Sequence, residues 1–173
     1  MSEGWSQLND IDRLADGHAD LDFAIPLDVL PRLQAKLAGT RGSVHGVAHF
    51  SRAAGLPIAQ LDIEGVAELV CQRCLAPMRW PVKSSSRVAL VASEQQADRV
   101  PEDLEPVLAE DDRLRLRDLV EEELLLSLPI VPLHADPKDC GAGVKRVLDE
   151  ERAATPTTQK PFERLAELLK RNE

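Results

Sequence analysis

Residues 43–92 carry three runs of apolar and β-branched residues separated by short turns, and this stretch limits the possible folds more than any other. The runs cover residues 44–52, 56–71 and 80–92. Gly55-Leu56-Pro57 lies at the first junction, and a Cys-x-x-Cys turn lies at the second. Strands that follow one another through such short connections pair antiparallel. The pattern therefore predicts an antiparallel β-meander.

Extended and helical patterns flank these strands. Residues 23–27 are expected to be extended, and residues 30–37 fit a short helix that stops before Gly39 and Gly42. A clearer helix ends at Pro129, with Asp118 and the acidic residues 121–123 on its solvated side and, at helical spacing, Leu116, Leu119, Val120, Leu124 and Leu128. We therefore predict an α+β fold: an antiparallel β-meander or partly closed sheet with a few packed helices and a C-terminal helical tail.

Composition suggests where the ordered domain begins and ends. Residues 1–20 are expected to be a flexible acidic leader, and residues 21–150 a single α+β domain with an exposed acidic loop at about 93–113. Residues 151–160 have linker composition. Residues 161–173 predict a short amphipathic helix with Pro161 in its first turn and one stripe that contains Phe162, Leu165 and Leu169. This helix either docks on its own domain or binds a partner.

The charge and the cysteine number limit the classes of function. The chain has 173 residues, three cysteines and a formal net charge of -9. An odd number of cysteines fits a reducing compartment, and no apolar run is long enough to span a membrane, so we expect a cytoplasmic protein with no membrane partner. An acidic chain is not a general nucleic-acid binder, because phosphate neutralisation needs a basic surface. Any RNA contact must therefore be local.

Four residues have the composition of a metal site. Cys71 and Cys74 are spaced Cys-x-x-Cys, and His134 and Cys140 follow about sixty residues later. Three thiolates and one imidazole can complete a tetrahedral Zn²⁺ shell. The alternatives are buried reduced thiols and a thiol redox site. Pro77 argues against the redox site, because a helix beginning at Cys71 would meet a proline in its interior.

A basic island stands out in this acidic chain. Arg73, Arg79, Lys83 and Arg87 lie in a stretch without acidic residues, between Glu68 and Glu94. In a strand, Arg79, Lys83 and Arg87 would share one face, with Trp80 on the opposite apolar face. This stripe can contact RNA phosphates or an acidic partner; the alternative is an ordinary solvated strand face. No nucleotide-binding loop or hydrolase motif is present in the sequence, so no catalytic site is predicted.

Several blocks of the sequence resemble those of one bacterial family. They are Cys71-Gln72-Arg73-Cys74-Leu75-Ala76-Pro77, then residues 118–134 with Leu128-Pro129-Ile130-Val131-Pro132-Leu133-His134, then Cys140, and finally Lys160-Pro161-Phe162. In order and spacing they are similar to the large ribosomal RNA subunit accumulation proteins (YceD family).

This resemblance implies a non-enzymatic factor that supports the synthesis, processing or stability of large-subunit (23S) ribosomal RNA during ribosome assembly. The implied partners are that RNA, a pre-ribosomal particle or a basic ribosomal protein, with no small-molecule substrate. The family's cysteine pair corresponds to Cys71 and Cys74, and its later His and Cys correspond to His134 and Cys140. A zinc-binding interaction module and a thiol redox protein remain the alternative functions.

Overall fold

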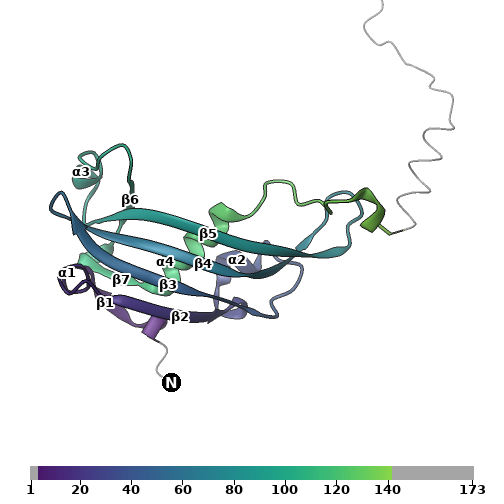
Figure 1. Cartoon of the computed structure of the whole chain (residues 1–173), viewed down its shortest axis with the longest axis horizontal. Helices are drawn as coiled ribbons and strands as arrows, with labels where there is room; N and C mark the ends of the chain where they lie inside the picture. Colours follow the sequence, from purple (N-terminus) through teal and green to yellow (C-terminus); the bar gives the residue numbers. More distant parts are fainter. Residues whose placement is uncertain (1–3, 142–173) are drawn as a thin grey trace, which may run out of the picture.

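The computed structural model describes residues 4–141, and a five-stranded sheet forms its centre (Figure 1). The strand order is β2-β3-β4-β5-β6, in which β3, β4 and β5 form the predicted antiparallel meander and β2 extends it by pairing antiparallel with β3. These four strands are β2 (Asp20–Pro26), β3 (Ser43–Ala53), β4 (Leu56–Val70) and β5 (Pro77–Val91). The α+β prediction is confirmed, but the sheet is open and not partly closed.

The fifth strand corrects the predicted acidic loop at 93–113. Residues Glu105–Leu108 form β6, which pairs parallel with β5, so the sheet is mixed. Ser93 accepts a hydrogen bond from the Gln96 N–H and caps the short helix α3 (Glu94–Ala97). The N–H of Ala109 then donates to the Val91 carbonyl at 2.8 Å. This segment is ordered because the free edge of β5 supplies hydrogen-bond partners that local composition does not reveal.

Part of the expected flexible leader is also ordered. Strand β1 (Leu8–Asp10) pairs antiparallel with β7 (Arg113–Arg115), and helix α1 (Ile11–Asp16) buries Ile11 and Ala15. The Arg52 guanidinium on β3 bonds to Asp12 at 2.7 Å and to Asp16 at 2.8 Å. Residues 8–16 lie within the predicted flexible leader, and in the structure two of their acidic side chains form ion pairs with this distant cation.

One face of the sheet carries the hydrophobic core. Helix α4 (Leu116–Ser127) covers this face, and it buries Leu116, Leu119, Val120 and Leu124 as predicted. The remaining helices are α2 (Pro31–Gln34) and four 3-10 turns at Gly4–Ser6, Leu27–Val29, Glu110–Asp112 and Pro137–Asp139. Within residues 4–141, no helix has the length and apolar character needed to span a bilayer. The predicted linker and C-terminal helix, with Pro161, Phe162, Leu165 and Leu169, lie outside the described residues and remain predictions.

The acidic residues of α4 are not all solvated, which differs from the prediction. Glu121 is only 4% exposed, and its Oε1 accepts the backbone N–H groups of Arg32 at 2.7 Å and Leu33 at 3.0 Å. These are two of the unpaired N–H groups in the first turn of α2, whose preceding residue, Leu30, provides no side-chain cap. Glu122 pairs with the Arg32 side chain at the surface. A carboxylate from α4 therefore caps α2.

Replacement of Glu121 by alanine should destabilise the protein by about 2 kcal/mol, because it leaves one buried and one partly buried N–H group without an acceptor. Glu122→Ala removes an exposed ion pair and should cost less than about 1 kcal/mol. Urea unfolding of both variants beside wild type measures the difference. Equal effects of the two substitutions would contradict the capping role of Glu121.

Candidate metal centre

The first half of the candidate site is the turn between β4 and β5. Cys71 directly follows β4, its N–H donates to the Ala76 carbonyl at 3.0 Å, and the Leu75 N–H donates to the Cys71 carbonyl at 2.8 Å. Leu75 adopts a left-handed conformation with φ of 58°. No helix begins at Cys71. The turn is therefore the strand-to-strand connection that the sequence predicted, and it directs two thiols toward the same point.

The second half comes from the segment after α4. Pro129 follows the helix, and the chain then runs beside the sheet to the far end of the β4–β5 hairpin (Figure 1). The Pro132 carbonyl accepts the Gln72 N–H at 2.8 Å, which holds this segment against the cysteine turn. Asp136 caps the 3-10 turn at Pro137–Asp139 by accepting the Lys138 N–H at 2.8 Å. That turn places Cys140 beside His134.

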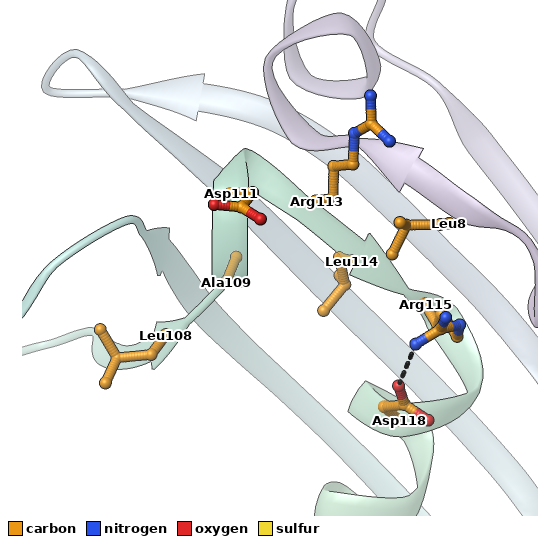
Figure 2. A pocket seen from close by; sticks show the side chains of 8 residues that line it. All are labelled: Leu8, Leu108, Ala109, Asp111, Arg113, Leu114, Arg115 and Asp118. Carbon is orange, nitrogen blue, oxygen red and sulfur yellow. Dashed lines mark ion pairs between the residues drawn. The ribbon is translucent and has the colours of Figure 1, made fainter.

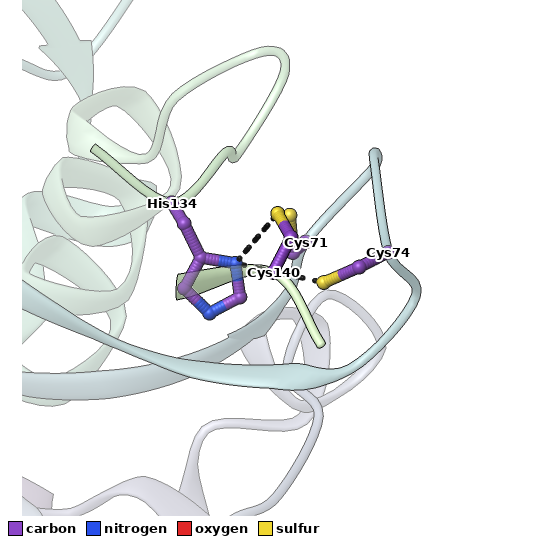
Figure 3. A group of neighbouring side chains, drawn as sticks. All are labelled: Cys71, Cys74, His134 and Cys140. Atoms are coloured by element: carbon purple, nitrogen blue, oxygen red, sulfur yellow. Dashed lines mark hydrogen bonds between the residues drawn. The ribbon is translucent and has the colours of Figure 1, made fainter. Parts of the chain in front are cut away.

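The four predicted residues meet in one cluster (Figure 3). Their donor atoms all lie within 4.8 Å of one another, with Cys71 and Cys140 buried and Cys74 and His134 half-buried. The His134 Nδ1 lies 3.6 Å from the Sγ atoms of Cys74 and Cys140. Zn–S bonds of about 2.3 Å and Zn–N bonds of about 2.0–2.1 Å place N and S about 3.6 Å apart in a tetrahedral site. The cluster can therefore hold a metal ion, and its donor set fits Zn²⁺.

The cluster environment acts differently on its thiols. Burial raises the pKa of Cys71, but N–H groups of Cys74, His134 and Arg73, together with the His134 side chain, outweigh that effect and hold this pKa at about 5. Burial and the neighbouring Cys74 thiol raise the pKa of Cys140. The surroundings of Cys71 thus favour its thiolate form, whereas burial of Cys140 disfavours its thiolate form unless a positive charge lies nearby.

Arg73 provides such a charge within the cysteine turn. Its guanidinium Nη1 lies 3.8 Å from the Cys140 Sγ and donates a hydrogen bond to it. A site with three thiolates and one imidazole around Zn²⁺ carries a net charge of about -1, which a guanidinium can neutralise. Arg73, a member of the predicted basic island, therefore belongs to the surroundings of the cluster. Its position inside the Cys-x-x-Cys motif was the available signal for this role.

The other three predicted cations do share one exposed strand face. Arg79, Lys83 and Arg87 are exposed on β5, whereas Trp80 packs against the core on the opposite face. Lys83 forms an ion pair with Glu64 at 2.9 Å, and its hydrogen bond lowers the pKa of that carboxyl. Arg79 stands opposite Glu68 in the strand register, and Arg87 stands opposite Gln60. The three cations thus lie on one exposed face of β5, and neighbouring acidic residues reduce the charge of that face.

A separate cavity of about 720 Å³ lies between β1, β6 and β7 (Figure 2). Two arginines and two aspartates are among its lining residues, so its charges are balanced. Arg115 lies 3.9 Å from Asp118, which also pairs with Arg117 at 3.0 Å. This balanced composition offers no particular chemistry, and the cysteine cluster remains the strongest candidate site.

The fold and the site define a small α+β protein whose Cys₃His cluster ties a loop to the end of a long β-hairpin. The sequence profile of the family described as large ribosomal RNA subunit accumulation protein YceD matches residues 59–169. This range covers more than half of the chain and includes both halves of the cluster. The chain belongs to this family.

A relative in Haemophilus influenzae has the name large ribosomal RNA subunit accumulation protein YceD. It is 36% identical over 114 residues, which cover 63% of this chain and 61% of the relative. The match thus spans less than two thirds of the relative's length. No solved structure matches this chain significantly.

The position of Arg73 leads to a prediction about metal affinity. Arg73→Ala should weaken Zn²⁺ binding by roughly 10-fold or more, because loss of a group that bonds to a ligand typically costs about 10–100-fold in affinity. Arg79→Ala, which removes an equal charge nearby without a contact to the cluster, should leave the affinity unchanged. Competition with a chromophoric chelator measures both values. Equal affinities in the two variants would show that Arg73 does not support the site.

Proposed function

We propose that the protein is a non-enzymatic cytoplasmic factor that supports the synthesis, processing or stability of large-subunit (23S) ribosomal RNA during ribosome assembly. The observation that carries this proposal is the family match over residues 59–169, and the name of the Haemophilus influenzae relative points to the same process. We further propose that the protein binds this RNA, a pre-ribosomal particle or a basic ribosomal protein. Arg79, at the end of the exposed β5 stripe that lies next to the cysteine turn, supports the RNA contact.

The cluster supports a structural zinc ion as part of this function. Four protein ligands leave no coordination position open for a substrate, which distinguishes structural from catalytic zinc sites. The ligands come from two segments about sixty residues apart, so a bound ion would fasten residues 130–140 to the β4–β5 turn. Buried ligands and an apolar surround that includes Leu69 and Met78 would protect the ion from solvent.

An interaction module is a second candidate function that is compatible with the first. Apolar residues are exposed around the segment that the cluster would fasten: Leu75 is 73%, Ile130 99% and Val131 57% exposed. Exposed apolar residues next to a rigid site are suited to a protein partner. A thiol redox role is less well supported. Cys71 is the thiol whose pKa the cluster lowers, but it is fully buried and cannot reach a disulfide substrate.

The metal proposal predicts about one equivalent of zinc in freshly purified protein. Cys74→Ser should lose most of this zinc, since a hydroxyl is a poor zinc ligand, and it should lower the thermal midpoint in the absence of added metal. Elemental analysis by mass spectrometry measures the zinc. Ser85→Ala, on the exposed face of β5, is the matched control. Wild-type protein that contains no zinc and gains no stability from added Zn²⁺ would remove the metal from the proposal.

The assembly proposal predicts that depletion of the protein lowers the ratio of mature large-subunit to small-subunit ribosomal RNA. Restored wild-type protein should correct the ratio, and Cys74→Ser should correct it only partly if the metal centre supports the function. Electrophoresis of total RNA from depleted and complemented cells measures the ratio. An unchanged ratio under verified depletion would contradict a role in large-subunit RNA accumulation.

A further inference from the structure

Two of the four cations in the predicted basic island are already engaged within the protein. Arg73 donates to the Cys140 Sγ, and Lys83 pairs with Glu64 at 2.9 Å. In contrast, the side chains of Arg79 and Arg87 form no ion pair or hydrogen bond with any residue of the described range 4–141. Only these two members of the island are therefore available to a ligand without the loss of an internal contact.

Arg79 shares a pocket with a second arginine that lies outside the island. A shallow pocket of about 370 Å³ on the open sheet face is lined by Arg41, Ser43 and His45 from the start of β3 and the loop before it, and by Arg79 from β5. Within residues 4–141, Arg41 also lacks a side-chain partner. The loop reaches this position through Gly42, whose φ of +111° is a conformation that favours glycine. The sheet thus brings together two unpaired guanidinium groups, one imidazole and one hydroxyl.

One acidic residue, Glu68, also lines this pocket, and it forms no ion pair with Arg41 or Arg79. Glu68 lies opposite Arg79 in the register, but no ion pair joins them. Its carboxylate lies against Gly39, where a Cβ added to the glycine would be only 2.5 Å from the Glu68 Oε2. Glu68 also anchors the Gly39 segment through its backbone, since its carbonyl accepts the Ala38 N–H at 2.7 Å. Glu68 therefore holds the loop that carries Arg41, while both guanidinium groups keep their donors available.

We propose that the pocket formed by Arg41, Ser43, His45 and Arg79 binds a backbone phosphate of RNA. Guanidinium groups bind phosphate oxygens through paired hydrogen bonds, and a serine hydroxyl and an imidazole N–H are further phosphate donors. The pocket is open and its arginines are exposed, which suits a phosphate on a long strand more than an enclosed small molecule. The inference rests on the proposed role in ribosomal RNA accumulation, and it names the contact that such a role needs.

Acidic residues on the remainder of this sheet face limit the RNA contact to the end of the sheet beside the cysteine turn. Asp20 and Asp22 on β2 and Asp62 on β4 lie on the same face and repel a phosphate backbone. The Lys83–Glu64 pair adds no net charge. Arg87 lies eight residues beyond Arg79 along β5, about 26 Å at the usual strand rise, and cannot contact the same phosphate. The RNA contact is therefore placed beside the cysteine turn.

The test measures binding of an in vitro 23S ribosomal RNA transcript to the full chain over a salt series by filter retention. The double substitution Arg41→Gln/Arg79→Gln should weaken binding and reduce the slope of log affinity against log salt by about 1, because one phosphate is no longer neutralised. Lys83→Gln and Arg87→Gln each remove one charge from the same strand and should leave the slope within error of wild type. Unchanged thermal midpoints show that these exposed substitutions do not affect folding.

Three outcomes would overturn the inference, and they are distinguishable. An unchanged slope in the double variant, with wild-type protein still bound to the transcript, would reject this pocket and leave the assembly role intact. Equal losses of affinity for the transcript in the Lys83→Gln and Arg41→Gln/Arg79→Gln variants would indicate general charge attraction. Wild-type protein that binds a basic ribosomal protein but not the transcript would replace the RNA contact by a protein contact.

Discussion

The pairing of β4 with β5 determines where the other parts of the structure lie. These two 15-residue strands pair from Ile58 opposite Ala89 to Val70 opposite Pro77. The cysteine turn forms one end of this hairpin. One face of the two strands packs against the core under α4, and the other face carries the exposed charged residues. Residues 130–140 complete the arrangement, because they return from α4 to the turn and bring His134 and Cys140 to it. The position of the cysteine cluster therefore depends on a strand register that is set many residues away.

Charge in this acidic chain is compensated mainly by long-range contacts. Arg52 joins two aspartates of α1 to β3, and Glu121 joins α4 to the backbone of α2. These contacts use carboxylates as structural groups, so the net charge of -9 is not only a solubility feature. Within residues 4–141, Arg41 and Arg79 take part in none of these contacts. An acidic protein of this kind can contact RNA only where its cations are not already neutralised by ion pairs within the protein. The pocket with Arg41 and Arg79 is such a place.

Patterns that are long and local allowed correct prediction of much of the fold and of the cluster. The three β runs predicted the meander, apolar spacing predicted α4, and the residue types at 71, 74, 134 and 140 predicted one site. The failures share a different cause. Each missed feature depends on a partner far along the chain. Residues 8–16 contact Arg52, and β6 pairs with the edge of β5. Glu121 is buried because it caps the first turn of α2. Local composition contains no signal for such partners. Arg41 was missed for the same reason, because only the register of β3, β4 and β5 brings it beside Arg79.

The cysteine cluster and the proposed phosphate pocket share strand β5, which would connect their functions. Arg79 is the third residue of β5, directly after the turn that carries two of the cluster's cysteines. An ion bound at the cluster would hold this turn through four ligands, and so it would limit the positions available to the start of β5 and to Arg79. Pre-organised side chains lose less conformational entropy when a ligand binds. A structural zinc ion could in this way raise the affinity for a phosphate that it never contacts. The acidic remainder of the sheet face would then confine the RNA to the end that the metal makes rigid.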